Sequence, residues 1–469
     1  MAFDKKQLHI LFFPLMSPGH FIPMIDMACI FASHNVRSTV VATPSDASKI
    51  PLSKSKYISV VTIPFPSPSL TNLPPDHENL ATIRSSMFDL FVSALSLFQP
   101  PLQNLIHDLK PDCLISDSLF PWTADLALQF KIPRIIFHGA GVFPMYVSAN
   151  IFSHFPLDES KEEFFMDGLA EKIKLYRKGL PDMFSNIPFL ITMGEAEAKS
   201  YGVVVNTFRE MEPTYVDFYK GTKKAWCIGP LSLANKLDEE KTAGWIAEKE
   251  EVKEKIVKWL DGKEEGSVLY VCFGSLCHFS GGQLRELALG LEKCNKNFLW
   301  VVRKEAEGDD VSEKEWMPEN YKERVGERGL VVKGWVPQTT VLDHKSVGWF
   351  VTHCGWNSLQ ESTCAGVPMI TWPLFHEQFI NAEFLVETMG IGERMWEGFR
   401  KSEYRKFDDV IVTADEIAGV VGRVMGGGEK YEEMKRKAKD YGEKAKKAVD
   451  EGGSSYNDVV ALIEELKTL

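Results

Sequence analysis

Short runs of apolar and β-branched residues alternate along the chain with longer segments whose apolar residues recur at helical spacing. This alternation predicts a parallel β-sheet in each half, because helices return the chain between consecutive parallel strands. In the first half the predicted strands are Leu8–Phe13, Ser38–Ala42, Val60–Ile63, Cys113–Ser116, Arg134–Phe137 and Val203–Asn206. In the second half they are Ser267–Phe273, Phe298–Val302, Gly329–Lys333, Trp349–Thr352 and Met369–Thr371. The expected fold class is α/β, with two doubly wound domains.

A segment dense in Lys and Glu, residues 237–266, separates the two halves and contains the pattern of a surface helix. We therefore expect an N-terminal domain over residues 1–240 and a C-terminal domain over 241–455. The last residues, 456–469, form an amphipathic helix that we expect to pack back on the N-terminal domain. Ligands of open parallel sheets bind beyond the carboxyl ends of the strands, so two such domains would hold their ligands in a cleft between them.

Composition narrows the choice of partners and compartment. Lys and Arg number 53 against 65 Asp and Glu, and the net charge of -12 disfavours nucleic acid and anionic lipid as general partners. No run of apolar residues approaches the length of a membrane span, so no stable membrane insertion is expected. The eight cysteines form no C-x-x-C pair, and no Asn-x-Ser/Thr sequon occurs, which favours a reducing, cytoplasmic location. We expect a monomer.

Several common nucleotide motifs are absent. The first strand runs into a Pro-containing turn that ends at His20, rather than into a G-x-G-x-x-G turn, which argues against dinucleotide binding. The chain has no G-x-x-x-x-G-K-[ST] loop and no D-x-D pair. A diphosphate bound by this chain would therefore be held without a metal, and no cofactor is expected.

A strand, a glycine turn and a helix follow one another around His353. Asn357 and Ser358 stand where helix caps are expected, and Ser358 has capping-box spacing to Glu361. The free N–H groups at such a helix start favour an anion, and His353 can donate a further hydrogen bond. A second anion-suited turn contains Ser275. The alternative is that these polar residues only cap a helix and that His353 is structural.

Motifs at fixed spacings connect these turns to a known family. A box of 44 residues contains Trp335-Val-Pro337-Gln338, the run from His353 to Ser358, Gly366-Val-Pro368 and Glu377-Gln378, while Pro18-Gly-His20 and Phe273-Gly-Ser275 lie outside it. In these features the chain resembles the plant secondary-product UDP-sugar glycosyltransferases of family 1. The resemblance implies a GT-B fold, with two Rossmann-like domains across a cleft. The first domain would bind the acceptor and the second would bind UDP-glucose as co-substrate.

The resemblance also implies roles for the residues of the donor half. Trp335 would stack on the uracil, Gln338 would contact the nucleoside, and Glu361 would accept hydrogen bonds from the ribose hydroxyls. The implied diphosphate ligands are His353, Asn357, Ser358 and Ser275, the sugar ligands are Glu377 and Gln378, and Trp356 completes the UDP-sugar set. Alternatively, Trp335 is a core aromatic residue, and Glu377 and Gln378 begin an ordinary solvated helix.

In its second half the chain departs from the family pattern at two places, and in the first half His138-Gly-Ala-Gly141 stands where relatives often have a Thr or Ser that touches the sugar. Leu359 and Gln360 replace a small or β-branched residue and a Leu before Glu361, so packing of this helix face can differ. Cys277 stands where relatives often have a hydroxyl residue near the phosphate, which puts that contact in doubt.

The first domain contains a candidate general base. His20 follows the first strand, and Asp117 follows a strand that a parallel sheet could place beside it. A carboxylate at one imidazole nitrogen fixes the tautomer and stabilises the charged form. From the residues alone, His20 could equally be a turn or capping histidine, and Asp117 the N-cap of the helix that begins at Pro121. In the family that the chain resembles, the histidine of the Pro-Gly-His turn is the base and the aspartate is its partner.

The resemblance implies that the reaction is a direct displacement at the anomeric carbon, with inversion from α to β. The apolar stretches Met87–Phe98, Phe120-Pro-Trp122 and Phe137–Tyr146 predict a flat pocket for a planar aromatic hydroxyl. The overall similarity of this chain to the family suggests that the acceptor is indoxyl and the product is indican. A related phenol or flavonoid is the other acceptor expected. The alternatives are a UDP-sugar epimerase and a non-catalytic UDP-sugar-binding protein on the same scaffold.

Overall fold

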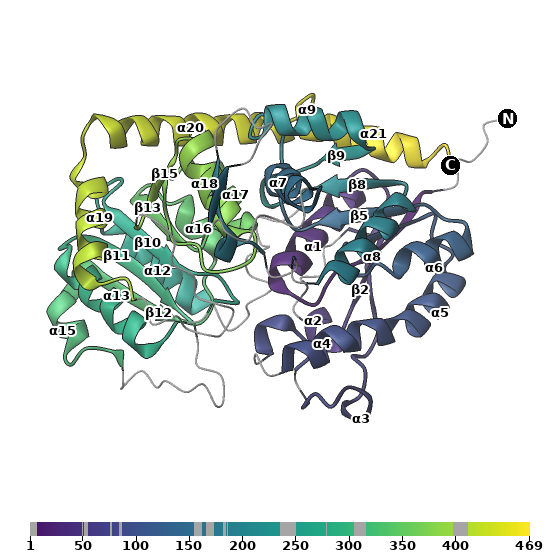
Figure 1. The fold of residues 1–469 in the computed structure, drawn as a ribbon, viewed down its shortest axis with the longest axis horizontal. Helices are drawn as coiled ribbons and strands as arrows, with labels where there is room; N and C mark the ends of the chain where they lie inside the picture. Colours follow the sequence, from purple (N-terminus) through teal and green to yellow (C-terminus); the bar gives the residue numbers. More distant parts are fainter. Residues whose placement is uncertain are drawn as a thin grey trace. The chain divides into compact units, whose positions relative to one another are not determined.

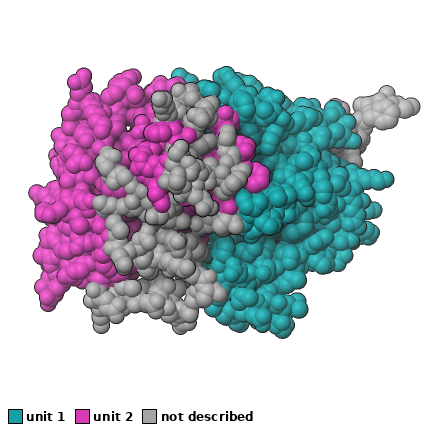
Figure 2. Space-filling view, viewed as in Figure 1, with its two compact units in different colours: residues 1–143, 185–247, 445–469 teal, residues 144–184, 248–444 magenta. Residues whose placement is uncertain are grey.

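The structure is a computed structural model that describes most of the chain. It leaves out residues 1–6, 49, 51–54, 76, 84–86, 154–161, 166–172, 182–183, 185, 235–249, 278, 304–315 and 397–410. The chain divides into two compact units (Figures 1 and 2). Unit 1 comprises residues 1–143, 185–247 and 445–469, and unit 2 comprises 144–184 and 248–444.

Unit 1 is built on a parallel sheet of seven strands in the order β3-β2-β1-β4-β5-β8-β9. The strands are β1 (His9–Phe13), β2 (Arg37–Ala42), β3 (Ile58–Thr62), β4 (Cys113–Asp117), β5 (Arg134–His138), β8 (Gly202–Val205) and β9 (Ala225–Cys227). Alternate residues of β1 point to opposite faces, so that Phe12 and Phe13 lie in two different apolar clusters. The sheet therefore has a buried core on each face, as in a doubly wound fold.

Helices cover both faces of this sheet. The elements of unit 1 are α1 (Pro18–Ser33), α2 (Pro44–Ala47), α3 (Pro68–Thr71), η1 (Leu80–Thr82), α4 (Phe88–Leu95), η3 (Ser96–Phe98), α5 (Gln99–Leu109), α6 (Thr123–Phe130), α8 (Ile187–Ala198), α9 (Pro213–Thr222), α10 (Leu231–Ala234) and α21 (Ser454–Leu466). Residues of α1 and α21 share one cluster with Phe12, while residues of α4, α5 and α6 share the other with Phe13. Helix α7 (Val142–Ser153) begins in unit 1 and continues into unit 2.

Unit 2 is built on a parallel sheet of six strands in the order β12-β11-β10-β13-β14-β15. The strands are β10 (Val268–Cys272), β11 (Asn297–Val302), β12 (Gly329–Lys333), β13 (Val347–Thr352), β14 (Met369–Thr371) and β15 (Gly392–Arg394). Trp300, Trp349 and Trp372 pack in one cluster with α13 and α19, which lie side by side (Figure 1). Large buried aromatic residues therefore supply much of the core of this unit.

The remaining elements of unit 2 connect these strands or extend beyond them. They are α12 (Glu250–Asp261), α13 (Gly281–Lys293), α15 (Tyr321–Val325), η6 (Gly326–Arg328), α16 (Gln338–Leu342), α17 (Trp356–Ala365), α18 (Gln378–Glu383), η7 (Phe384–Thr388) and α19 (Ala414–Gly426). A small antiparallel hairpin consists of β6 (Glu163–Phe165) and β7 (Lys174–Tyr176), followed by η4 (Arg177–Gly179). Helix α20 (Glu429–Val449) runs without a break across the division between the units.

The final helix completes the core of unit 1. Val459, Leu462, Ile463 and Leu466 of α21 are buried in the cluster that contains Phe12. Polar contacts also hold the helix, because Asp458 accepts hydrogen bonds from the Lys220 ammonium at 2.5 Å and from the Cys227 amide at 2.7 Å. The C-terminal segment of the chain is therefore an integral part of the N-terminal unit.

The observed division differs from the expected boundaries, because residues 241–247 and 445–455 cluster with unit 1 although they were expected in the C-terminal domain. Residues 144–184 cluster with unit 2, whereas the sequence analysis assigned everything up to residue 240 to the first domain. The described part of this segment includes most of α7, the β6–β7 hairpin and η4, and β7 lies against α18 of unit 2. The charge pattern of the sequence does not indicate that this segment belongs to unit 2, because the assignment depends on a tertiary contact. Among the described residues, no helix is long and apolar enough to cross a membrane.

Candidate active site

One candidate site lies at the carboxyl ends of β1 and β4, which are neighbours in the sheet of unit 1. Asp117 is the last residue of β4, and His20 lies in the first turn of α1, just beyond β1. The Nδ1 atom of His20 is 2.7 Å from Oδ2 of Asp117. The Asp117 side chain is fully buried, while 27% of the His20 side chain is exposed. The parallel topology thus brings together two residues that are far apart in the sequence.

Neither residue has the capping role that the sequence left open. Asp117 is not the N-cap of a helix at Pro121, because α6 begins at Thr123 with Trp122 in the N-cap position. Its Oδ1 atom accepts a hydrogen bond from the Leu119 amide at 3.0 Å. One carboxylate oxygen therefore holds the backbone turn while the other contacts the imidazole.

Arg134 supports this turn from the neighbouring strand, and the sequence analysis did not select it. Its guanidinium is buried and donates to Ser116 Oγ, Ser200 Oγ and the carbonyl oxygens of Asp117 and Phe120. Burial lowers the pKa of Arg134 to about 10, although Asp117 and Glu197 attract its charge. The arginine remains charged near neutral pH. An Arg inside a predicted buried strand was the signal that could have identified it.

Unit 2 has a candidate site of its own at the carboxyl ends of β10 and β13. These strands are neighbours, with Cys272 opposite Thr352, and each leads into a turn with a positive φ angle. At Gly274 the backbone has φ +72°, and a Cβ atom added there would lie 2.7 Å from Cε1 of His353. The two predicted anion-suited turns, at Ser275 and at His353, therefore lie together. Only a glycine at position 274 leaves room for the His353 ring.

The helix after His353 begins earlier than expected. Helix α17 starts at Trp356 with Gly355 as its N-cap, and no side chain caps it. The prediction that Asn357 or Ser358 caps the helix, with a capping box to Glu361, is therefore wrong. Both residues lie inside the first turn, where their backbone N–H groups point toward the helix start. The glycine-containing turn leaves the helix N-terminus without a side-chain cap.

His353 is neutral in this environment. Burial lowers its pKa to about 4, and its buried Nδ1 atom has no hydrogen-bond partner among the described residues. A neutral imidazole carries one N–H group and can donate one hydrogen bond. His353 can thus provide a donor to an anion but no positive charge.

Gln338, Ser358 and Glu361 form a hydrogen-bonded group. The Gln338 amide nitrogen donates to Ser358 Oγ at 2.9 Å and to Glu361 Oε2 at 2.8 Å. The Gln338 amide oxygen accepts from the hydroxyl of Tyr270, a fully buried residue of β10, at 3.3 Å. The side chain of Gln338 therefore orients Glu361. The sequence does not indicate this role of Tyr270, because the position of a tyrosine inside a buried strand does not show which polar group its hydroxyl contacts.

The other predicted donor residues differ in exposure. Trp335 follows β12 and is half-buried, as are Ser275, Asn357 and Glu377. Trp356 is buried and packs near Phe384 at 6.4 Å between ring centroids, so little of its side chain is open to a ligand. Gln378 is also buried, and its Oε1 atom accepts from the amides of Leu374 and Phe375. The amide oxygen of Gln378 thus stabilises its own loop.

Both departures from the family pattern in the second half of the chain are explained by packing. Cys277 is buried in the apolar cluster of unit 2, where burial raises its pKa well above the ordinary value. It is therefore a core residue rather than a polar substitute for a hydroxyl. Leu359 and Gln360 are both fully buried in α17.

The stretches predicted to line the acceptor pocket mainly form core. Phe91, Phe98, Phe120 and Phe137 are buried, and the ring of Phe120 packs against Phe13 at 4.4 Å between centroids. The half-buried apolar side chains at the edge of this core are Met87, Leu90 and Trp122. The sequence shows which residues of these stretches are apolar. It does not show which of their side chains remain near the surface.

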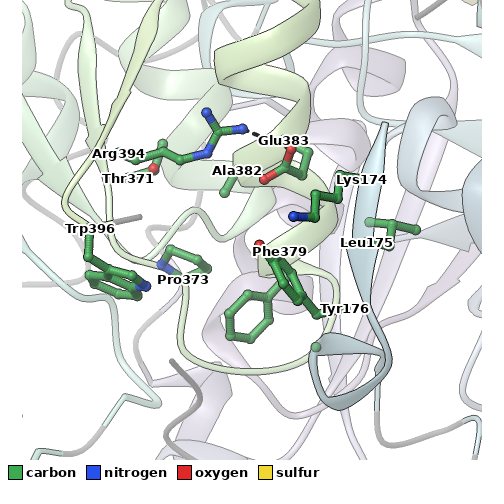
Figure 3. A pocket seen from close by; sticks show the side chains of 11 residues that line it. Lys174, Leu175, Tyr176, Thr371, Pro373, Phe379, Ala382, Glu383, Arg394 and Trp396 are labelled. Atoms are coloured by element: carbon green, nitrogen blue, oxygen red, sulfur yellow. Dashed lines mark hydrogen bonds and ion pairs between the residues drawn. The ribbon is translucent and has the colours of Figure 1, made fainter. Parts of the chain in front are cut away.

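Unit 2 also contains a hollow of about 500 Å³ that is partly open to solvent (Figure 3). Tyr176, Phe379 and Trp396 line it together with two cationic residues. Both cations are already paired, since Arg394 contacts Glu383 and Glu387, and Lys174 contacts Glu163. The hollow therefore offers an anion no unpaired positive charge. Among the described residues, no group of three or more His, Cys, Asp or Glu side chains lies together as a metal site would require.

Comparisons with known proteins define the class to which this fold and these two candidate sites belong. Residues 101–402 match the family model described as UDP-glucoronosyl and UDP-glucosyl transferase. The chain is 40% identical to scopoletin glucosyltransferase from Nicotiana tabacum, with 98% of each chain covered. The chain therefore belongs to this family of glycosyltransferases, as the plant family 1 motifs predicted.

Solved structures agree with this assignment. UGT73P12 from Glycyrrhiza uralensis, complexed with glycyrrhetinic acid 3-O-monoglucuronide, matches with a TM-score of 0.90 and 33% identity over 99% of this chain and 96% of that one. UGT71G1 from Medicago truncatula, complexed with UDP-glucose, matches with a TM-score of 0.80 and 26% identity over the full length of both chains. The predicted GT-B fold is confirmed, and the chain is an enzyme that transfers glucose from UDP-glucose.

Proposed function

We propose that this enzyme is an inverting O-glucosyltransferase of small planar aromatic hydroxyls, with His20 as its general base and Asp117 as the partner of that base. The observation that carries the proposal is the 2.7 Å contact between His20 Nδ1 and the buried carboxylate of Asp117. A buried carboxylate in this position accepts the Nδ1–H and leaves the lone pair on Nε2. The partly exposed imidazole is then able to take a proton from a bound hydroxyl.

The proposed reaction is a single displacement. His20 takes the proton of the acceptor hydroxyl as the acceptor oxygen forms a bond to the anomeric carbon. The bond between that carbon and the diphosphate oxygen breaks, UDP leaves from the opposite face, and the α-glucoside of the donor becomes a β-glucoside. General-base assistance contributes about 10²- to 10⁴-fold. Asp117 stabilises the imidazolium that forms.

The donor roles are proposed from the geometry of unit 2. We assign the diphosphate to the turns of Ser275 and His353 and to the first turn of α17, which contains Asn357 and Ser358. Helix N-termini favour anions, and uncapped N–H groups together with a neutral imidazole can stabilise the leaving diphosphate by hydrogen bonding. No metal takes part in the proposed mechanism.

Further donor contacts are assigned to polar and aromatic groups near these turns. We assign the ribose hydroxyls to Glu361, whose carboxylate Gln338 orients, and the uracil to the half-buried Trp335. The glucose hydroxyls are assigned to Glu377 and to the amide nitrogen of Gln378. For Trp356, burial limits the proposed contribution to its backbone N–H at the start of α17.

For the acceptor we propose indoxyl, giving indican, within a wider tolerance for phenols and flavonoids. The similarity to a scopoletin glucosyltransferase supports an aromatic hydroxyl. In unit 1, the half-buried Met87, Leu90 and Trp122 are among the apolar side chains of the predicted acceptor stretches that remain near the surface, together with the exposed Val92 and Leu97. An indole ring would find apolar and aromatic contacts there.

The experiment is incubation of the full chain with UDP-glucose and a panel of phenols that includes indoxyl, in the presence of EDTA. We expect a β-glucoside, identified by mass spectrometry and by the anomeric coupling in NMR. An α-glucoside would exclude the inverting mechanism, and loss of activity in EDTA would exclude metal independence. Efficient transfer to other phenols with none to indoxyl would remove only the indoxyl assignment.

The same assay separates the base from the alternatives. His20→Ala should lose most transfer activity while UDP-glucose binding, measured by calorimetry, is largely retained. A UDP-sugar epimerase would convert the donor without forming a glucoside, and a non-catalytic binding protein would show neither reaction. Comparable transfer rates in His20→Ala and the parent enzyme would contradict the assignment of the base.

We also propose that the enzyme acts as a monomer in the cytoplasm. All eight cysteines are free thiols in the structure, and seven of them are buried. Thiols are kept reduced in the cytosol. Light scattering after size-exclusion chromatography tests the monomer, and microscopy of a fluorescent fusion tests the location.

A further inference from the structure

The turn between β13 and α17 contains a residue in an unfavourable backbone conformation. Cys354 has φ +64°, in the left-handed region, and its side chain is fully buried. For a residue other than glycine this region is disfavoured, because the Cβ atom crowds the neighbouring backbone. Such a conformation persists only where the surrounding structure holds it, and it is common at ligand-binding turns.

Two side chains hold the backbone on either side of Cys354. The hydroxyl oxygen of Thr352 accepts a hydrogen bond from the Cys354 amide at 3.2 Å. The amide nitrogen of Asn381, a fully buried residue of α18, donates to the Cys354 carbonyl oxygen at 2.9 Å. Asn381 thus reaches this turn from a different helix.

The contact with Asn381 fixes the direction of the next N–H group. The carbonyl of Cys354 and the N–H of Gly355 belong to one planar trans peptide and point in opposite directions. Since Asn381 holds the carbonyl, the Gly355 N–H points away from Asn381. Gly355 is the N-cap of α17, so this N–H belongs to the uncapped helix start.

The same peptide fits closely against His353. A Cβ atom added to Gly355 would lie 2.4 Å from Nε2 of His353, and one added to Gly274 would lie 2.8 Å from the same atom. The imidazole therefore lies against both glycine turns. A rotation of the peptide between Cys354 and Gly355 would disturb the ring as well as the helix start.

We propose that Asn381 is a positioning residue for diphosphate binding. It holds the Cys354–Gly355 peptide so that the Gly355 N–H and the His353 ring are presented together to the diphosphate of UDP-glucose. The inference rests on the proposed function, in which this turn binds the diphosphate. A residue needed only for packing would be apolar. Asn381 is polar instead, and its buried Oδ1 atom has no hydrogen-bond partner among the described residues, which costs free energy.

Gln283 provides a matched control in the same unit. It is also a buried carboxamide, and its nitrogen donates to the carbonyl oxygen of Val412 at 2.9 Å. Val412 lies before α19 and far along the chain from the glycine turns. The Gln283 amide oxygen also accepts from the Val412 N–H at 2.8 Å, so Gln283→Leu removes this hydrogen bond as well as one of the kind that Asn381→Leu removes. Only Asn381→Leu removes a hydrogen bond from the turn at Cys354.

The test compares the affinities of the full-length variants for UDP and for uridine, which lacks the diphosphate. Asn381→Leu should weaken UDP binding by about 3- to 10-fold, as expected for loss of one hydrogen-bonded positioning contact. Uridine binding should be unchanged, so the ratio of the two affinities falls. Gln283→Leu should lower thermal stability and leave the ratio unchanged. Asn381→Ser, which is smaller and polar, replaces Asn381→Leu if the leucine variant does not fold.

Three outcomes separate the possibilities. An unchanged ratio in a folded Asn381 variant overturns the inference while the proposed function stands. An equal fall of the ratio in Gln283→Leu also overturns it, because the effect would then be a general consequence of a lost buried hydrogen bond. If the parent enzyme binds uridine as tightly as UDP, the assignment of the diphosphate to this turn fails first, and the role of Asn381 fails with it.

Discussion

Gly139 lies directly against the ring of His20. A Cβ atom added to Gly139 would be 2.8 Å from Cε1 and 3.0 Å from Nδ1 of that ring. These distances are shorter than normal van der Waals contacts, and Asp117 holds the ring at Nδ1. The position of the proposed base therefore depends on the absence of a side chain at residue 139.

This relationship predicts a catalytic defect in Gly139→Ala. The methyl group would push the imidazole away from Asp117, and misplacement of a reacting group by about 1 Å can lower the rate by about 100-fold. We expect kcat to fall by about 10- to 100-fold with little change in UDP binding. Gly194→Ala is the control, because no atom lies within 4 Å of a Cβ at that helical glycine. Equal kcat values in the two variants would contradict the prediction.

Tyr270 should affect the affinity for the nucleotide through Gln338 and Glu361. Tyr270→Phe removes the hydroxyl that donates to Gln338 and leaves the stacked contact with Phe350. We expect KM for UDP-glucose to rise by about 2- to 10-fold with kcat nearly unchanged, since one neutral hydrogen bond is lost.

A second buried tyrosine of unit 2 provides the control for this prediction. The hydroxyl of Tyr321 donates to the carbonyl of Ala288 at 2.9 Å, and Tyr321→Phe should leave KM unchanged. Binding of UDP and of 2′,3′-dideoxy-UDP gives a second readout. If Glu361 binds the ribose, the preference for UDP should shrink in Tyr270→Phe, and a preference equal to that of the parent enzyme would exclude the role of Tyr270.

His353 should make folding stability rise with pH in mildly acidic solution. Burial lowers its folded-state pKa from 6.5 to about 4. Between these pH values the unfolded chain binds a proton that the folded chain does not, so acid favours unfolding. His353→Asn should flatten this part of the curve of urea midpoint against pH. A slope identical to that of the parent enzyme would show that the buried imidazole does not titrate as described.

Glu212 should have the opposite effect. Its carboxylate is buried and accepts hydrogen bonds from Thr207 and from the amides of Val142 and Phe143 at the start of α7, yet burial dominates and raises its pKa to about 7. Between pH 4.5 and about 7 the folded chain binds a proton that the unfolded chain has lost, so stability falls as pH rises. Glu212→Gln should reduce this fall, measured by the same urea midpoints. A steeper fall in the variant would contradict the sign.

Helix α21 should contribute strongly to stability. Leu462 is fully buried in the cluster that contains Phe12, and Leu462→Ala should lower the free energy of unfolding by about 2–5 kcal/mol. Leu469→Ala is the control, because 66% of that residue is exposed. Urea unfolding followed by circular dichroism measures both variants. A similar small effect in the two would mean that α21 is not part of the core.

The alternation of short apolar runs with segments of helical spacing predicted the central strands of both sheets, because those strands are continuous apolar runs. It missed β9 and β15, which are three-residue strands at the sheet edges, and β15 carries Glu393 and Arg394. Both are short and partly exposed, so they lack the apolar run that marks a buried strand, whereas the edge strands β3 and β12 have five residues each and were predicted.

The candidate site was predictable where it depends on local sequence. The turns at His20 and His353 follow predicted strands directly, and their place at the sheet edge follows from parallel topology. The supporting contacts were not predictable. Gln338 orients Glu361, and Asn381 holds Cys354, only because helices pack in one particular way. Spacing along the chain does not encode such packing.

The insertion of α21 into the core of unit 1 has a consequence for biosynthesis. Most of unit 1 leaves the ribosome first, but four apolar residues of its core lie between Val459 and Leu466, almost at the end of the chain. Translation proceeds at about 5–20 residues per second, so the nascent chain waits tens of seconds before these residues emerge. The core of unit 1 therefore cannot be completed before α21 has been synthesised, and the apolar surface that α21 covers stays open until then.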